Sequence, residues 1–116
     1  MELNEFYKKV GGDYEKVLLR LLTPSMIKKF VCRFVQDPSY AELEKALENK
    51  QAANAFRAAH TLKGTAATLG LDQLAQTAAD LTEELRNAAE IPEVNSAERV
   101  KEAYQMTVGY IAELEA

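Results

Sequence analysis

Apolar residues recur at steps of three and four along nearly the whole chain, and no convincing stretch alternates with the two-residue period of a strand. Steps of three and four place apolar side chains on one face of an α-helix. The pattern is interrupted at Gly11-Gly12, Thr23-Pro24, Asp37-Pro38, Gly70 and the segment 91–96. It therefore predicts an all-α protein.

The interruptions divide the chain into seven predicted helices. They cover residues 3–10, 13–22, 25–36, 40–49, 51–69, 72–89 and the segment from about 96 onward. Three of these helices have about 18 to 20 residues and would each be about 30 Å long. Because short connections favour antiparallel neighbours, we expect residues 1–116 to form a single up-down bundle domain, although other arrangements of the same helices stay open.

Polar residues at the interruptions predict helix caps. Ser39 and Glu42 have the spacing of a capping box, in which a hydroxyl and a carboxylate satisfy each other's free amides. Asp72 is expected to cap the helix 72–89, and either Asn95 or Ser96 the last helix.

The composition allows one hydrophobic core. Of the 116 residues, 47% are apolar and 28% are charged, which argues against disorder. No apolar run approaches the roughly 20 residues that span a bilayer, and the first residues lack the order of a signal peptide. We therefore expect a cytoplasmic protein that does not enter a membrane.

Charge and rare residues exclude several classes of function. The net charge of −4 argues against a nucleic-acid partner, because binding to phosphates needs a basic surface. One cysteine and one histidine supply neither a disulfide nor a structural zinc site, and no spacing suggests another metal. No glycine-rich phosphate loop occurs, which argues against ATP binding. Cys32 lies off the apolar stripe of its helix and is expected only to fill space.

The single histidine, His60, lies in the predicted helix 51–69. The core face of this helix combines small and large apolar residues, namely Ala52, Ala55, Phe56, Ala59, Leu62, Ala66 and Leu69. At about 100° per residue, His60 lies about 120° from the centre of that face. We therefore expect its ring to point to solvent beside the bundle seam.

Four neighbours of His60 on the helix surface favour a chemical role. Gly64 lies one turn away, where a glycine costs the helix about 1 kcal/mol relative to alanine but opens an approach to the ring. On the next turn, Ala67 has a small side chain that leaves the approach to the ring unobstructed. Lys63 and Arg57 lie three residues to either side, and their charges would stabilise a dianionic phosphoryl group. Each residue alone has an ordinary explanation, so only the combination indicates function.

The run AHTLKGTAATLG, residues 59–70, resembles the signature of histidine-containing phosphotransfer (HPt) domains, H-x-x-K-G followed by small residues and a hydrophobic-Gly pair. The resemblance covers residues 5–90, and the final helix only by pattern. It implies an antiparallel up-down four-helix bundle with an additional short N-terminal helix. It also implies that His60 accepts a phosphoryl group on Nε2, that Lys63 stabilises this group and that Gly64 gives access.

Two positions depart from the family pattern. Thr65 stands where serine is common, and Thr82 stands where an acidic residue often follows the leucine. Neither belongs to the set formed by His60, Lys63 and Gly64, so the departures leave the implied chemistry intact.

The resemblance implies a phosphocarrier and not an enzyme. Its partners would be response-regulator receiver domains, which supply the aspartate, the Mg²⁺ and a lysine of their own. A hybrid sensor histidine kinase is a further candidate partner. The chain itself would need no cofactor and would act as a monomer, and we expect partners to dock around Phe56 and Ala67.

Two alternative functions stay open. One is a phosphoacceptor domain that serves a kinase, of the sensor or the chemotaxis type. Sensor-kinase domains typically carry an acidic residue after the histidine, whereas Thr61 follows here. Because Met1 opens the sequence, we expect a free-standing protein instead. The other alternative is a degenerate helical adaptor, against which the intact His60, Lys63 and Gly64 argue.

Overall fold

Seven α-helices and one short 3₁₀ helix make up the fold, and the computed structural model describes residues 1–115. The elements are α1 (Leu3–Lys9), α2 (Tyr14–Leu21), α3 (Pro24–Arg33), η1 (Phe34–Gln36), α4 (Ser39–Glu48), α5 (Ala52–Thr68), α6 (Asp72–Leu85) and α7 (Ala97–Glu115). No strand occurs within residues 1–115, which confirms the predicted all-α class.

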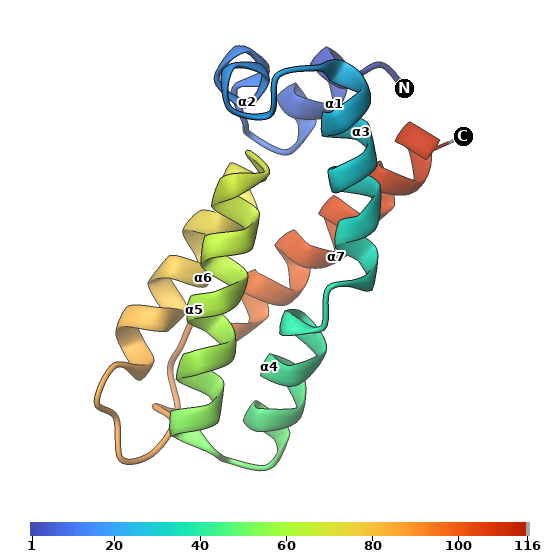
Figure 1. The fold of residues 1–116 in the computed structure, drawn as a ribbon. Coiled ribbons are helices and arrows are strands. Elements are labelled where there is room, and N and C mark those ends of the chain that lie inside the picture. Colours follow the sequence, from blue (N-terminus) through green and yellow to red (C-terminus); the bar gives the residue numbers. More distant parts are fainter. Residues whose placement is uncertain (116) are drawn as a thin grey trace.

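Helices α4 to α7 pack against one another in sequence order (Figure 1). α7 also packs against α3, which continues through η1 into α4 along one side of the molecule. α1 and α2 lie across the upper end of α5 and α6 in this view. The two chain ends meet at the same end, where the Met1 amino group donates a hydrogen bond to the Glu113 carbonyl at 3.2 Å.

The predicted core face of α5 is confirmed. Six of its seven positions are buried, namely Ala52, Ala55, Ala59, Leu62, Ala66 and Leu69. Phe56 is half-buried at the edge of this face. Leu62 is fully buried, and truncating such a leucine to alanine typically costs about 2–5 kcal/mol. This face therefore fixes the rotation of α5 about its axis, and with it the direction of every exposed side chain on the helix.

Side chains from α1 and α2 close the C-terminal end of α5. The hydroxyl of Tyr7, which is 1% exposed, donates to the Leu69 carbonyl at 2.7 Å. Arg20 Nη1 donates to the carbonyls of Ala67 and Thr68 at 3.0 and 2.7 Å. Carbonyls in the last turn of a helix have no partner within the helix, so these bonds satisfy groups that otherwise need water. The sequence predicted neither contact.

The glycine breaks are also confirmed. Gly11 and Gly70 adopt positive φ angles of 75° and 73°, a region that glycine enters without steric cost. Asp13 caps α2, because its Oδ1 accepts a hydrogen bond from the Lys16 amide at 3.2 Å.

The predicted capping box at Ser39 and Glu42 is wrong. Ser39 is the first residue of α4 and is buried, and its amide donates to Asp37 Oδ1 at 2.9 Å. Pro38 holds the N-cap position and no side-chain capping bond is made from it. The Asp37 carboxylate thus accepts from the first amide of α4, and the amide of Glu42 donates to the Pro38 carbonyl and not to the Ser39 hydroxyl.

The predicted limits of the sixth helix are corrected at both ends. Asp72 begins α6 and does not cap it, and the amide of Gln73 donates to the Val10 carbonyl of the α1 end at 3.1 Å. α6 stops at Leu85 and not near residue 89, because Arg86 has an extended ψ of 121° and Asn87 a φ of 57°.

Of the two residues predicted to cap α7, Asn95 makes the side-chain bond to the start of the helix and Ser96 does not. Asn95 Oδ1 accepts a hydrogen bond from the Ala97 amide at 2.9 Å. The Ser96 hydroxyl instead donates to Glu84 Oε2 at 2.6 Å and so ties the loop to α6. Cys32 is half-buried and packs against the core, closer to the stripe than its position in the sequence suggested.

Candidate functional site

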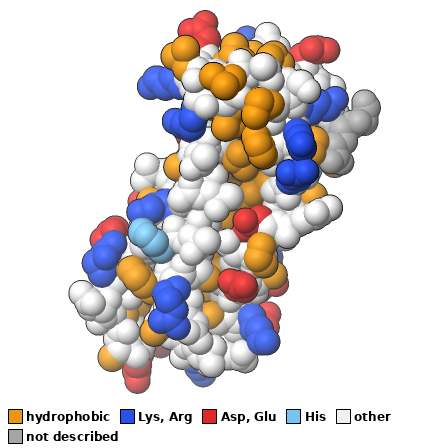
Figure 2. All heavy atoms as spheres, in the orientation of Figure 1, with side chains coloured by type: hydrophobic (Ala, Val, Ile, Leu, Met, Phe, Trp, Pro, Cys, Tyr) orange, Lys and Arg blue, Asp and Glu red, His pale blue; other side chains and the backbone are white. Residues whose placement is uncertain are grey.

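His60 lies in the middle of α5 and is exposed, as the phase of the helix predicts. Figure 2 shows the histidine at the surface, with Lys and Arg side chains on the surrounding protein. The residues on either side of it in the sequence, Ala59 and Thr61, are buried and exposed respectively. The ring therefore stands where the buried face of α5 gives way to solvent.

Gly64 leaves open space one turn from His60. Among the described residues, no atom outside the neighbouring α5 backbone lies within 4 Å of the position that a Gly64 Cβ would take. Ala67 and Thr68 are exposed on the following turn. No large side chain of Gly64 or Ala67 therefore covers the helix surface between His60 and the end of α5, and a partner can approach the ring from this side.

The two predicted cations lie on opposite sides of His60. Lys63 is half-buried and faces α6, where its charge reaches the carboxylate of Glu83. Arg57 is exposed, donates a hydrogen bond to Asn54 Oδ1 and lines a groove between α4 and α5. The flanking arrangement expected from the spacing is thus present, with Arg57 turned along its own helix.

Phe56 packs directly against the histidine. Its ring is stacked on the imidazole with centroids 6.0 Å apart and an interplanar angle of 13°. The guanidinium of Arg86, from the end of α6, lies 5.1 Å from the centroid of the Phe56 ring. The half-buried Phe56 therefore contacts the core, the imidazole and a cation that the sequence did not single out.

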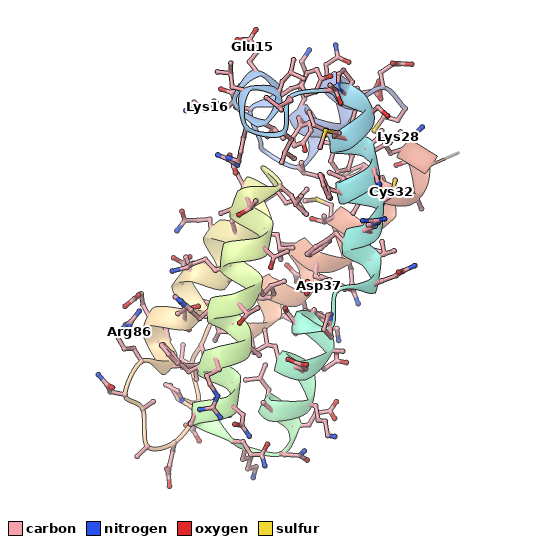
Figure 3. All side chains as sticks on the ribbon, in the orientation of Figure 1. Glu15, Lys16, Lys28, Cys32, Asp37 and Arg86 are labelled. Atoms are coloured by element: carbon pink, nitrogen blue, oxygen red, sulfur yellow. The ribbon has the colours of Figure 1, made fainter. Side chains whose placement is uncertain are left out.

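Arg86 is itself held by a carboxylate. Its Nε and Nη2 donate to the two oxygens of Glu83 at 3.0 and 2.9 Å. These hydrogen bonds hold the pKa of the Glu83 carboxyl below its usual range, and the charges of Lys63 and His60 act in the same direction. Figure 3 shows the Arg86 side chain projecting outward at the C-terminal end of α6.

A groove of about 720 Å³ runs beside His60, between α3–η1 and α5. One wall comes from α3, η1 and the residue after it, through Phe30, Arg33, Phe34, Gln36 and Asp37. The other wall comes from α5, through His60, Thr61, Gly64, Thr65, Thr68 and Leu69. Figure 3 places Asp37 at the junction between η1 and α4. The groove carries both an apolar surface and charges of both signs close to the imidazole.

Sequence reasoning missed Glu83, Arg86 and the α3 wall of the groove. The spacing of Glu83 and Arg86 marks a pair on one helix face, but an exposed pair of this kind is common and carries no functional signal. Their position beside Phe56 depends on how α6 packs on α5, and Arg86 follows Phe56 by 30 positions in the sequence. A periodic pattern reports which face is buried and does not report which exposed residues meet.

Among residues 1–115, no group of three or more His, Cys, Asp or Glu side chains is placed to hold a metal ion. None of the described helices combines the length and apolarity that crossing a bilayer requires.

The comparisons with known proteins bear on this site. No curated protein and no solved structure matches the chain. The family model of the Hpt domain matches residues 38–109, which include α4, α5, α6 and most of α7. The match contains His60, Lys63 and Gly64, and α1 to α3 lie outside it. The family model covers well over half of the chain, and the chain has an exposed histidine beside an open glycine within the matched helices. The chain therefore belongs to the Hpt domain family, whose members carry phosphoryl groups in two-component signalling.

Proposed function

We propose that this chain carries a phosphoryl group on His60 and exchanges it with the aspartate of response-regulator receiver domains. The observation that carries the proposal is the exposed imidazole of His60 beside Gly64, where the space around a Cβ is empty. An exposed imidazole that a partner can reach from one side suits transfer between two proteins, because the donor and the acceptor must come within bonding distance.

The transfer step itself needs little from this chain. The Nε2 lone pair of His60 attacks the phosphorus of an aspartyl phosphate, so that an N–P bond forms and the P–O bond to the aspartate breaks. The aspartate leaves as a carboxylate, and the reverse step returns the group. The attack requires the uncharged form of the imidazole, in which Nε2 carries a free lone pair. The receiver supplies Mg²⁺, which neutralises charge on the transferred group.

Lys63 is the residue that we propose to stabilise the phosphoryl group on this chain. It lies beside His60 on the α6 side, and a charge-assisted hydrogen bond from an ammonium to a phosphoryl oxygen is stronger than a neutral one. Arg57 adds positive charge on the α4 side and would have to leave Asn54 to make contact. We propose a smaller role for Arg57 for that reason.

The docking surface that we propose includes Phe56, Ala67 and the groove between α3 and α5. A receiver seated there would cover the ring of His60 and exclude water during transfer. We further propose that the chain works as a cytoplasmic monomer, possessing the up-down four-helix topology over α4 to α7. A hybrid sensor kinase that carries its own receiver is a second partner of the same chemistry.

The test uses receivers that carry radiolabelled aspartyl phosphate in the presence of Mg²⁺. Wild-type protein and His60→Gln are mixed with a broad receiver panel. We expect label on the wild type alone, stable in base and lost in acid. Because the chain has one histidine, such a label assigns the position without further mapping. His60→Gln should keep the thermal stability of the wild type, since the side chain is exposed.

A second arm removes the dependence on finding a labelled donor. His60 is phosphorylated with phosphoramidate, a small donor, and the phosphoprotein is offered to the same receivers. We expect the group to move to the aspartate of at least one of them. A phosphohistidine that passes its group to no receiver would contradict the proposal and favour a degenerate adaptor bundle.

A further inference from the structure

The pair formed by Glu83 and Arg86 is not explained by stability. Its contact is bidentate, yet the two side chains are 64% and 46% exposed. Exposed pairs of this kind contribute little to folding because water and salt screen them. A weak pair that holds a guanidinium in one place can readily exchange its carboxylate for a more highly charged partner.

The pair lies within reach of the imidazole. The guanidinium is 5.1 Å from the Phe56 centroid and that centroid is 6.0 Å from the His60 centroid, so the two distances together keep the guanidinium within about 11 Å of the imidazole. The Glu83 carboxylate also responds to the charges of both Lys63 and His60. The ring contacts through Phe56 therefore place Arg86 on the edge of the site, and the electrostatics of Glu83 agree with this position.

We propose that Arg86 is a second phosphoryl-binding residue, which Glu83 holds in reserve until His60 is phosphorylated. The inference rests on the proposed function, because it concerns the same phosphoryl group. In the unphosphorylated protein the guanidinium stays on Glu83 and on the face of Phe56. A phosphoryl group brings about two negative charges and three acceptor oxygens, whereas a carboxylate brings one charge. Arg86 then leaves Glu83 and donates to the phosphoryl oxygens.

The charges around the site make Arg86 the cation best placed for this exchange. On α5, Lys63 faces α6 and Arg57 is hydrogen-bonded towards α4. Across the groove, Arg33 and Asp37 line the same wall, and the carboxylate of Asp37 would oppose an anion there. The α6 side of His60 therefore offers two cations, Lys63 and Arg86, and one carboxylate that can give up its partner.

The experiment measures the phosphoryl group itself. Wild type, Arg86→Gln and Arg99→Gln are phosphorylated with phosphoramidate, and the phosphohistidine is followed by ³¹P NMR as a function of pH. Arg99 is the control, because it is an exposed cation that lines a groove between α6 and α7. A nearby guanidinium favours the dianion, so we expect the phosphoryl pKa to rise in Arg86→Gln and to stay unchanged in Arg99→Gln. We also expect the lifetime of the phosphohistidine to fall about twofold to fivefold in Arg86→Gln.

Glu83→Gln tests the reserve role in the opposite direction. With its competitor weakened, Arg86 should bind the phosphoryl group more tightly and lower the phosphoryl pKa. The effect of Glu83→Gln should be smaller when Arg86 is also replaced by Gln, because the substitution then only removes the direct repulsion between Glu83 and the phosphoryl group. If Glu83→Gln changes the phosphoryl pKa equally in the presence and in the absence of Arg86, Arg86 does not exchange between Glu83 and the phosphoryl group.

The outcomes separate this inference from the proposed function. If the phosphoryl pKa and the phosphohistidine lifetime are the same in Arg86→Gln as in Arg99→Gln, Arg86 is not a ligand of the phosphoryl group. The proposed transfer to receivers would be unaffected by that result. Failure of the wild-type phosphoprotein to pass its group to any receiver would reject the proposed function instead.

Discussion

Two glycines six residues apart, Gly64 within α5 and Gly70 just after it, have opposite surroundings. A Cβ on Gly64 would meet no other part of the described protein within 4 Å. A Cβ on Gly70 would lie 2.2 Å from Val17 Cγ2 and 3.0 Å from Tyr7 Cε1, and the residue has a φ of 73°. The middle of α5 is open and its C-terminal end is closed by α1 and α2. One glycine therefore leaves room for a partner, and the other lets the chain pack against itself.

The substitution Gly70→Ala should disrupt the packing of α1 and α2 against the C-terminal end of α5. The added methyl group overlaps Val17 and forces an alanine into the left-handed region, so we expect the free energy of unfolding to fall by about 2–5 kcal/mol. Urea denaturation followed by circular dichroism measures the loss. The matched control is Gly109→Ala in α7, where nothing lies within 4 Å of the new Cβ. A Gly70→Ala variant as stable as the wild type would show that α1 and α2 do not press on this position.

Tyr7→Phe is expected to have the next largest effect. The substitution leaves the Leu69 carbonyl without its 2.7 Å hydrogen bond from a buried hydroxyl. An unsatisfied buried acceptor costs about 1–3 kcal/mol, and we expect a loss of stability in that range. Thermal unfolding of the variant beside wild type measures it. Phosphotransfer through His60 should keep its rate at temperatures where the variant is folded, since the changed contact lies at the far end of the helix.

The open middle of α5 was predictable from the sequence, because it depends on one helix. The 3.6-residue period placed His60 outside the core face that Ala59 and Leu62 share, and the structure confirms this. The open space at Gly64 follows from the same phase. Local geometry needs no knowledge of where the other helices lie.

The closed end was not predictable, because its contacts join distant parts of the chain. Arg20 bonds to carbonyls 47 and 48 residues away, and Tyr7 to one 62 residues away. Local rules also failed at the start of α4, where two polar side chains are close in the sequence and Asp37, not Ser39, accepts the hydrogen bond from a first-turn amide. The contact between Arg86 and Phe56 has the same origin as the contacts of Arg20, and it had no signal in the sequence for the same reason.

Gly64→Ala separates access from stability. The helix should gain up to about 1 kcal/mol, because alanine is the better helix former and nothing obstructs its methyl group. Gly109→Ala should gain about as much, so the pair forms a matched comparison. Only the change at Gly64 should slow transfer from receivers, and Gly64→Leu should slow it further at unchanged thermal stability. Equal transfer rates in all three variants would show that Gly64 does not govern access.

High pH should weaken the closed end through Tyr7, and the contact between α4 and α7 through Tyr40, without any mutation. Burial, with a smaller contribution from Tyr14, raises the pKa of Tyr7 above its ordinary value of 10.0. Burial, followed by the charge of Glu44, raises the pKa of Tyr40 to about 12. The folded protein therefore keeps these protons in a pH range where the unfolded chain loses them. The stabilisation is fully present below pH 10 and is lost as the pH rises towards 12 and beyond.

The measurement is the urea midpoint between pH 8 and pH 11.5 for wild type, Tyr7→Phe and Tyr40→Phe. We expect the midpoint of the wild type to be constant to about pH 10 and then to fall. Each variant should fall less steeply, and Tyr7→Phe should show the larger change because Tyr7 is 1% exposed whereas Tyr40 is only half-buried. A fall of equal slope in Tyr7→Phe and wild type would mean that its hydroxyl ionises as readily in the folded protein as in the unfolded chain. In that case α1 would not shield the end of α5 from water, and the contrast between the open middle and the closed end of α5 would rest on Gly70 and Arg20.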